Sequence, residues 1–484
     1  MGKPKRDGSG FSATKPGVAP KQQVANSSAD PAAREQQAVA LINQGKHPEA
    51  EAIFRELIAA GTNNHIVYVN LAAICGMQSR WGETTLLLKQ ALRLNPNHPG
   101  AYNNLGIALR DKGDLNAAIN SYKTALSLKP NYPEAHYNLG NVLKEQGDLN
   151  AAINSYKTAL SLKPNYPDAH KNLSMAELLI GDYKNGWKRY EYRFQCKKDQ
   201  NSLHSNPNCS QWKGKPLKAK DQLLLVSEQG LGDTLQFMRY ALALKNQGIA
   251  VSLCAKTKLH SLIRASGVDP YPVSPEDANK FSKGQWSPLL SVPRYLDVSP
   301  GNPIITEPYI KTTNELITKW QYILAGEKRP IIGINWQGNP RVEKTILKGR
   351  SLPLETFAPI AQYPNASLLS LQKDLGSEQL ENSSFKDHFV SCQQQINETW
   401  DFLETAAIIA NCDLVITSDT CVAHLAGGMG KTTWLLLHKV PDWRWGLKEE
   451  TSFWYPSMRL FRQQDRGHWD EVMEQVLTDL KSHF

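Results

Sequence analysis

The sequence predicts an α-helical solenoid of repeats, followed by an α/β region whose two Rossmann-like halves face a cleft. The stretch from Gly113 to Pro133 recurs without change from Gly147 to Pro167, an offset of 34 residues. From about residue 215 onward, short apolar runs alternate with helical stretches, as in a parallel sheet. The 484 residues also exceed the roughly 250 to 300 at which single cores stop growing. We therefore expect a disordered tail over 1–30, about five repeat units over 31–200, and α/β halves over 215–325 and 326–484.

Composition and charge narrow the classes of protein. The net charge is +9, but no long run of Lys or Arg concentrates it, which favours a mildly basic surface over a nucleic-acid partner. The seven cysteines are scattered, without a CxxC pair or a histidine at zinc spacing, which indicates reduced thiols, no metal site and a cytoplasmic location. The N-terminal residues lack the apolar stretch of a signal peptide, and no apolar run of about 18 residues predicts a membrane span.

The repeats have a fixed register. A step of 34 residues aligns Gly106 with Gly140 and Tyr122 with Tyr156, and it also aligns leucines along four units and alanines along two. This is the tetratricopeptide pattern, in which each unit is a pair of amphipathic helices. Small residues let the two helices approach closely, while the leucines and tyrosines fill the seam between them.

Four asparagines occupy the same place in successive units: Asn70, Asn104, Asn138 and Asn172. An Asn amide donates and accepts at once, so a ladder of such amides suits the backbone of an extended peptide. The repeat region and this ladder resemble the repeat arm of protein O-GlcNAc transferases, where such asparagines hold the acceptor polypeptide. The alternative, that Asn is only a common choice on a helix surface, stays open.

Apolar runs place the strands of the α/β region. In the first half we expect a strand over Gln222–Ser227, a helix over Thr234–Gln247 and a strand over Ala250–Cys254. The second half should contain strands over Pro330–Trp336, Ala366–Gln372, Leu414–Thr417 and Thr433–His438, with a helix over Trp400–Ala410. A Pro- and Ser-rich stretch near residues 286 to 308 is expected to separate the halves.

The segment from Glu228 to Tyr240, EQGLGDTLQFMRY, lies where the first strand turns into a helix, and ligands of open α/β sheets bind at such strand ends. Gly230 and Gly232 allow tight turns and close approach of a ligand, and Asp233 falls in the first turn of the helix. Asp233 is either a functional acid or a helix cap. Neither a GxGxxG dinucleotide motif nor a P-loop is complete in this chain, so both nucleotide motifs are excluded.

The segment from Ser418 to Lys431 follows a strand, and a helix beginning at Asp419 and Thr420 presents backbone N–H groups that suit a diphosphate. His424 lies one turn further on the same face, although a lone histidine is more often packed or solvated. A basic segment with Lys344 and Arg350 either clamps phosphate oxygens or is a solvated loop.

Two tryptophans, Trp443 and Trp445, follow what we expect to be the last strand. Their indoles either stack on a ligand or seal the contact between the halves, and burial is the favoured interpretation.

From about Trp212 to Phe484 the chain resembles the family 9 glycosyltransferases, which are heptosyltransferase-like proteins, in the branch fused to tetratricopeptide repeats. The resemblance rests on five motifs in family order: EQGLGDTLQFMRY, NWQGNP followed by RSLP, SLQK, VITSDTCVAHLAGGMGK and VPDWRWG. It implies the GT-B fold, with the acceptor bound mainly by the first half and the nucleotide-sugar donor by the second.

The resemblance also implies a metal-independent, inverting transfer from a nucleotide-diphosphate sugar, with no other cofactor. Asp233 would be the catalytic base that deprotonates the acceptor hydroxyl. The implied donor-binding residues are Gly232, Asn339, Lys344, Arg350, Gln372, Lys373, Ser418, Asp419, Thr420 and His424.

Three functional hypotheses remain from the sequence. The first is an active glycosyltransferase whose repeat arm recruits an acceptor or partner protein. The second is a protein-interaction scaffold with a degenerate GT-B domain, and the third is a protein O-glycosyltransferase that uses the asparagine ladder.

Overall fold

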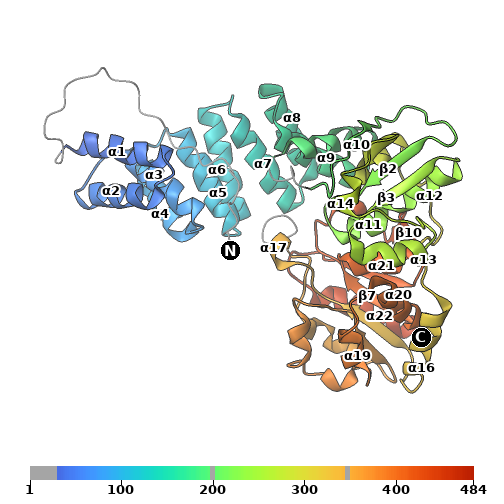
Figure 1. Ribbon diagram of the computed structural model, residues 1–484. Helices are drawn as coiled ribbons and strands as arrows, with labels where there is room; N and C mark the ends of the chain where they lie inside the picture. Colours follow the sequence, from blue (N-terminus) through green and yellow to red (C-terminus); the bar gives the residue numbers. More distant parts are fainter. Residues whose placement is uncertain (1–29, 197–201, 344–348) are drawn as a thin grey trace. The chain divides into compact units, whose positions relative to one another are not determined.

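The computed structural model describes residues 30–196, 202–343 and 349–484 (Figure 1). The chain divides into two compact units, residues 1–176 and 177–484. The predicted disordered tail, apart from Asp30, lies outside the described residues, as does Lys344. The predicted repeat region, residues 31–200, includes residues of both units.

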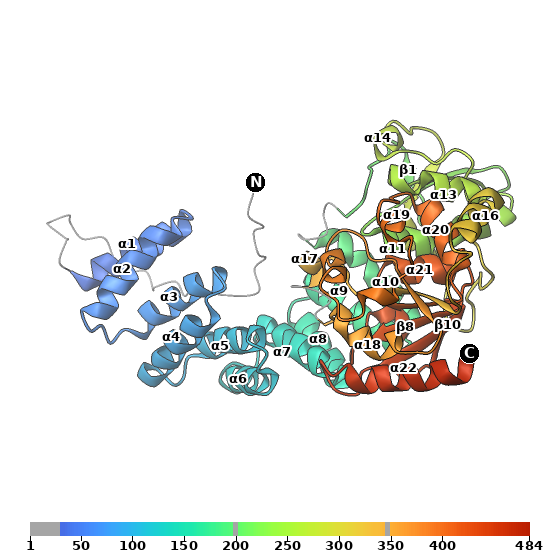
Figure 2. The same cartoon turned by 90° about the horizontal axis from the view of Figure 1, so that it is seen from below.

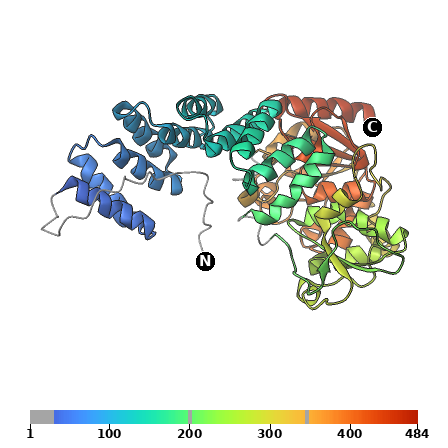
Figure 3. The ribbon, with the colours of Figure 1, turned by 90° about the horizontal axis from the view of Figure 1, so that it is seen from above.

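The first unit is built from helices that pack as successive pairs, and Figure 3 shows them stacked one after another from blue to teal. They are α1 (Pro31–Asn43), α2 (His47–Ala59), α3 (His65–Met77), α4 (Trp81–Leu94), α5 (Pro99–Asp111), α6 (Leu115–Leu128), α7 (Pro133–Gln146), α8 (Leu149–Leu162) and α9 (Pro167–Leu179). The last of these crosses the boundary between the units.

The repeat register explains the packing of these pairs. A Cβ atom on Gly106 would lie 2.6 Å from Cε1 of Tyr122, and a Cβ on Gly140 would lie 2.6 Å from Cε1 of Tyr156. Both tyrosines have no exposed surface. The predicted role of these two glycines is therefore confirmed: only glycine lets α5 reach the ring on α6, and α7 the ring on α8.

The second unit begins with one more helix, α10 (Tyr183–Tyr190), and contains two sheets. The first sheet has the order β1-β4-β2-β3 with all neighbours parallel: β1 (Ser210–Gln211), β2 (Gln222–Val226), β3 (Ala250–Cys254) and β4 (Gln285–Pro288). Its helices are α11 (Leu231–Phe237), α12 (Arg239–Asn246), α13 (His260–Ala265), α14 (Pro275–Ala278) and α15 (Val292–Tyr295).

The second sheet has six strands in the order β6-β5-β7-β8-β10-β9, parallel except for β9. They are β5 (Ile331–Asn335), β6 (Ser367–Ser370), β7 (Leu414–Ser418), β8 (Thr433–Leu437), β9 (Thr451–Ser452) and β10 (Tyr455–Arg462). Its helices are α16 (Asn314–Ile323), α17 (Pro340–Glu343), α18 (Ala358–Ala361), α19 (Gln393–Asn397), α20 (Phe402–Asn411), α21 (Cys421–Gly428) and α22 (Asp470–His483).

A single apolar cluster on one face of the six-stranded sheet joins β5, β7 and β8 to α22, the long C-terminal helix in Figure 2. Val472, Val476 and Leu480 carry the buried side of α22 at helical spacing. The two sheets confirm the predicted α/β region with mainly parallel strands. None of the helices in the described ranges is long and apolar enough to cross a membrane.

Three expectations about the strands and helices were wrong in detail. The stretch from residue 286, expected to separate the halves, begins inside β4, which lies between β1 and β2. Two further strands, β9 and β10, follow the segment that was expected to be the last strand. The helix expected over Thr234–Gln247 is two helices, α11 and α12, with Met238 between them.

Candidate functional site

The carboxyl ends of the two sheets are joined by a helix-to-helix contact. Helix α11 follows β2 and helix α21 follows β7, and the two helices pack against each other. A Cβ on Gly232 would lie 2.9 Å from Cδ2 of His424 and 3.4 Å from Cα of Cys421. Gly232 thus permits the close approach of the two helices. Their contact brings together the carboxyl ends of strands from both sheets, and α/β proteins bind ligands at such ends.

Asp233, the residue predicted as catalytic base or helix cap, lies in the first turn of α11. Its Oδ2 accepts a hydrogen bond of 2.9 Å from the backbone N–H of Gly230, so the carboxylate caps the helix. Its Oδ1 accepts a charge-assisted bond from Arg444. Burial raises the pKa of Asp233 above its ordinary value, and Arg444 opposes that rise.

Arg444 is a site residue that the sequence reasoning missed. It lies in a 3₁₀ turn, Trp443–Trp445, and its guanidinium donates to Asp233, to Oδ1 of Asp442 at 2.8 Å and to Oε1 of Gln236 at 2.6 Å. Only 8% of the residue is exposed. The sequence did contain a signal for this role, because Arg444 lies between two tryptophans that were expected to be buried. A charged residue in such a place needs a partner.

The indoles of the same turn are buried. Trp443 and Trp445 are each 2% exposed, which confirms the favoured interpretation that both indoles are buried. Trp445 lies parallel to the ring of His424, with centroids 5.4 Å apart and an interplanar angle of 20°. Nδ1 of His424 is 2.9 Å from the hydroxyl oxygen of Tyr455.

His424 is therefore a packed side chain, 6% exposed. Burial lowers its pKa well below the ordinary value, and the nearby cations Arg444 and Arg239 lower the pKa further. The ring is neutral at neutral pH and cannot offer a positive charge to a phosphate.

Asn335 ties the ends of β5 and β7 together. Its Oδ1 accepts from the hydroxyl of Thr420 at 2.7 Å, and its Nδ2 donates to Oε1 of Gln372 at 2.8 Å. Thr420 also caps α21 by accepting from the N–H of Val422 at 3.3 Å. Gln372 is 3% exposed, and its NH₂ group donates to the carbonyls of Gln337 and Leu375. Its side chain therefore positions the strand ends.

Ser418 and Asp419 end β7 at this edge. The hydroxyl of Ser418 is fully buried and has no hydrogen-bond partner within the part of the chain that the structure describes. Asp419 is 7% exposed, and burial raises its pKa to about 6. The neighbouring carboxylate of Asp442 raises the pKa as well, while Arg350 and Arg444 lower it.

The remaining predicted donor residues lie in different surroundings. Arg350 donates to the backbone carbonyl of Asp419 at 3.2 Å and pairs with Glu343 at 3.1 Å. Asn339 is exposed in the loop after β5. The ammonium of Lys373 donates to the carbonyl of Ile396 at the end of α19, and burial lowers its pKa to about 8.

Three carboxylates and two guanidinium groups thus meet where α11 faces the six-stranded sheet: Asp233, Asp419, Asp442, Arg350 and Arg444. The raised pKa values of Asp233 and Asp419 suit groups that take up a proton, and guanidinium groups suit phosphate oxygens. No three His, Cys, Asp or Glu side chains in residues 30–196, 202–343 and 349–484 are grouped to hold a metal ion.

The asparagine ladder is largely inside the first unit. Asn70 and Asn104 have no exposed surface and Asn138 is 2% exposed, whereas Asn172 is partly exposed. Asn138 donates to Oδ1 of Asn103 in the preceding repeat at 3.0 Å. Asn172 likewise donates to a side chain of the preceding repeat, at 2.8 Å. Asn138 and Asn172 therefore link successive repeats. Among the described residues, the amide of Asn70 and the NH₂ group of Asn104 have no hydrogen-bond partner, although both side chains are buried.

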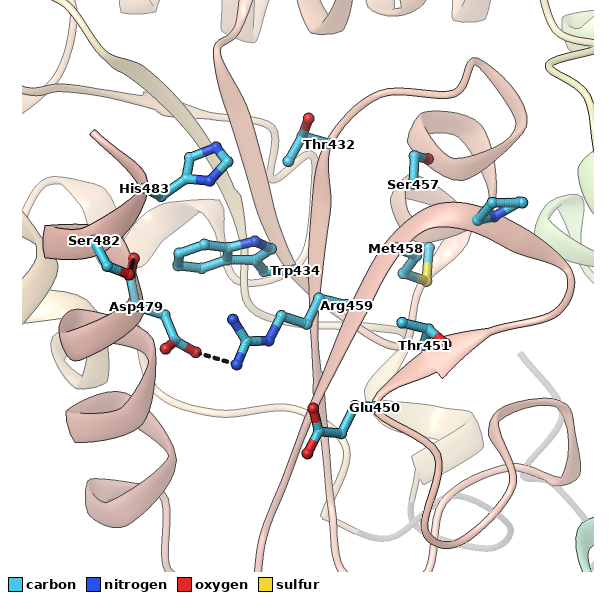
Figure 4. Close-up of a pocket in the computed structure, with 11 residues that line it drawn as sticks. Thr432, Trp434, Glu450, Thr451, Ser457, Met458, Arg459, Asp479, Ser482 and His483 are labelled. Carbon is cyan, nitrogen blue, oxygen red and sulfur yellow. Dashed lines mark hydrogen bonds and ion pairs between the residues drawn. The ribbon is translucent and has the colours of Figure 1, made fainter.

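A separate pocket of about 330 Å³ lies at the opposite, amino-terminal ends of β8 and β10 (Figure 4). Trp434 lies among its lining side chains, and Arg459 on β10 pairs with Asp479 on α22 at 2.7 Å across it. None of the predicted site residues lines this pocket.

Family comparisons bear on the repeats. A model described as TPR repeat matches residues 108–147 and 140–174, and a model described as Tetratricopeptide repeat matches residues 87–120. The predicted tetratricopeptide repeats are therefore confirmed in this part of the chain.

Individual proteins resemble the chain at low identity. Protein FlbA of Caulobacter vibrioides is 25% identical over 324 residues, which cover 61% of this chain and 52% of FlbA. The chain thus spans about half the length of this curated relative. The crystal structure of MamA is 22% identical and covers 34% of this chain and 96% of its own, with a TM-score of 0.31. The crystal structure of TTC0263, a thermophilic TPR protein of Thermus thermophilus, is 21% identical to this chain. The match covers 36% of this chain and 94% of TTC0263, with a TM-score of 0.31.

Proposed function

We propose that this chain is an inverting, metal-independent glycosyltransferase of the GT-B type that uses a nucleotide-diphosphate sugar and binds a partner protein through its repeats. The observation that carries the proposal is the contact between α11 and α21, which brings Asp233 of one sheet to the carboxyl edge of the other. Ligands of α/β folds bind at such edges, and a two-substrate transfer needs residues from both halves at one point.

In the proposed reaction Asp233 takes the proton of an acceptor hydroxyl as that oxygen attacks the anomeric carbon of the donor. The bond from the anomeric carbon to the phosphate oxygen breaks on the opposite face, so the configuration inverts and a nucleoside diphosphate leaves. The raised pKa of Asp233 supports the role of base, because general bases work best with a pKa near the working pH.

The leaving diphosphate would be held by protein groups alone. Arg350, which already contacts the backbone of Asp419, supplies a guanidinium for the phosphate oxygens. The buried hydroxyl of Ser418 has no hydrogen-bond partner among the described residues, and this supports a polar ligand at the end of β7, because buried polar groups are normally satisfied. Such fixed groups stabilise developing charge without reorganisation.

A protein-interaction role for the repeat arm is supported by the matched repeats, since this architecture presents extended binding surfaces. Transfer to a protein acceptor is a narrower form of the proposal. If the ladder serves a polypeptide acceptor, replacing Asn104 and Asn138 by Ala weakens transfer to polypeptides and spares small sugar acceptors. Equal loss with both acceptors points to a structural role of these buried amides instead.

One observation favours a scaffold without catalysis. Both carboxylate oxygens of Asp233 already have partners, the N–H of Gly230 and the guanidinium of Arg444, as a structural cap would. In that case the second unit binds no sugar nucleotide, and the repeats carry the function.

A thermal-shift screen of the full chain against ADP, GDP, UDP, CMP and their sugars separates these proposals. A ligand at 100 times its Kd stabilises the native state by about 2.7 kcal/mol, so one nucleotide base should raise the Tm clearly. Arg350→Ala should shrink the shift, whereas Arg459→Ala, in the pocket at the other end of the strands, should leave it unchanged. No shift with any nucleotide contradicts the enzyme and supports the scaffold.

A further inference from the structure

The segment that ends the repeats in sequence is built into the second unit. Helix α10 buries Tyr183, Trp187 and Tyr190, and a 3₁₀ turn over Glu191–Gln195 continues it. This segment precedes the first strand of the α/β region, yet its buried side chains reach two loops of the candidate site.

The strongest of these contacts is an ion pair with no exposed surface. Arg193 in the 3₁₀ turn places Nε and Nη2 each 2.8 Å from one carboxylate oxygen of Glu228, and neither side chain is exposed. The remaining donors reach the hydroxyl of Ser291 at 2.9 Å, the carbonyl of Tyr190 at 3.1 Å and the carboxylate of Glu191 at 2.9 Å. Such a two-pronged pair fixes the orientation of the carboxylate as well as its distance, which an ammonium group cannot do.

Glu228 begins the loop that leads to Asp233. The next residue, Gln229, has φ of +60°, a left-handed conformation that costs energy for a residue with a side chain. Its amide donates to the hydroxyl of Tyr190 at 3.1 Å. Two successive residues of this loop are therefore held by the α10 segment, at the point where the backbone is strained.

The same segment touches the loop that carries Arg444. Trp443, the preceding residue, meets the ring of Trp187 edge-on, with centroids 5.2 Å apart and an interplanar angle of 84°. It also lies 6.1 Å from the ring of Tyr190 at 60°. The two loops whose side chains pair, Asp233 with Arg444, thus share one support.

We propose that Arg193 is a positioning residue, which holds the Glu228–Asp233 loop so that the carboxylate of Asp233 faces Arg444 and the carboxyl edge of the six-stranded sheet. It acts through Glu228 and not on a substrate. The predicted effect of Arg193 on turnover rests on the proposed function, whereas its predicted effect on the conformation of the loop does not.

Hydrogen exchange on the full-length chain tests the loop directly. Arg193→Lys keeps the charge and loses the two-pronged geometry, so peptides covering residues 227–238 should exchange about tenfold faster or more. Glu228→Gln should have the same effect and serves as a second variant if the first does not fold. The matched control is Arg189→Lys in α10, which loosens the 3.0 Å ion pair with Glu177 in α9 and should leave the loop unchanged.

Turnover adds a readout that general destabilisation does not reproduce. For an active wild type, Arg193→Lys should lower kcat at unchanged KM for the donor, and Arg189→Lys should lower neither. If the loop exchanges at the same rate in Arg193→Lys, Glu228→Gln and the wild type, the inference is overturned. A wild type without turnover refutes the proposed function, while the exchange data still decide whether Arg193 holds the loop.

Discussion

Replacing Asp419 by Asn should stabilise the second unit at neutral pH. The pKa of Asp419 is raised from 3.8 to about 6 by burial and by Asp442, so the folded state binds a proton more tightly than the unfolded chain. The stabilisation from this proton is complete below the unfolded pKa and is lost as the pH rises through about 6. At pH 7 the ionised carboxylate therefore costs the fold about 3 kcal/mol, since each pKa unit is worth about 1.4 kcal/mol.

An asparagine stands in for the protonated acid at every pH. The gain in free energy of unfolding should be about 3 kcal/mol at pH 7 and roughly half of that at pH 5, where the unfolded carboxylate is still mostly ionised. Urea titration followed by tryptophan fluorescence measures this in the second unit, because eleven of the twelve tryptophans, all but Trp81, lie in residues 177–484.

Asp269→Asn is the matched control. Asp269 is also buried, but its two carboxylate oxygens accept from the backbone N–H groups of Leu253 and Tyr271. In the Asp269→Asn variant the NH₂ group would face one of these N–H groups, so one hydrogen bond would be lost. It should cost about 1 to 3 kcal/mol. If Asp419→Asn destabilises the unit as the control does, or stabilises it equally at pH 5 and pH 7, the reasoning on the buried carboxylate is refuted.

Two further predictions concern glycine contacts. Gly140→Ala places a Cβ 2.6 Å from the buried ring of Tyr156 and should cost about 1 to 3 kcal/mol in a urea titration followed by circular dichroism, whereas Gly82→Ala, with open space in α4, should gain up to about 1 kcal/mol. Gly232→Ala should lower the free energy of unfolding, measured by urea titration with tryptophan fluorescence, by a similar 1 to 3 kcal/mol, roughly, because its Cβ would meet His424. An unchanged midpoint for Gly232→Ala would mean that α11 does not pack closely on α21.

Local sequence patterns predicted the features that depend on residues close together in the sequence. The repeat register predicted the contacts of Gly106 and Gly140, and apolar runs predicted β2, β3 and β5 to β8. Strand β4 was missed because its sequence, QWSP, mixes polar residues with a proline. Its Ser287 is fully buried and pairs with Leu225 of β2, a contact that its own sequence does not reveal.

The candidate site was predictable only in part, because its contacts join residues far apart in sequence. Asp233 was singled out from its loop, but its partner Arg444 comes 211 residues later and its support through Arg193 comes from the repeat end of the chain. His424 illustrates the reverse case: the pattern placed it on the expected helix, but burial and the nearby cations Arg444 and Arg239 remove the charge that a phosphate would need.

The central claim is that Asp233 is the base of a glycosyl transfer. The most direct measurement is release of nucleoside diphosphate from the sugar nucleotide that the thermal-shift screen selects, by the wild type and by Asp233→Asn. Loss of a general base predicts a fall in kcat of about a hundredfold or more with nucleotide binding retained. Asp148→Asn, which alters the cap of α8 in the repeats, should have wild-type turnover. Turnover of Asp233→Asn equal to that of the wild type would contradict the account and leave Asp233 as the cap of α11.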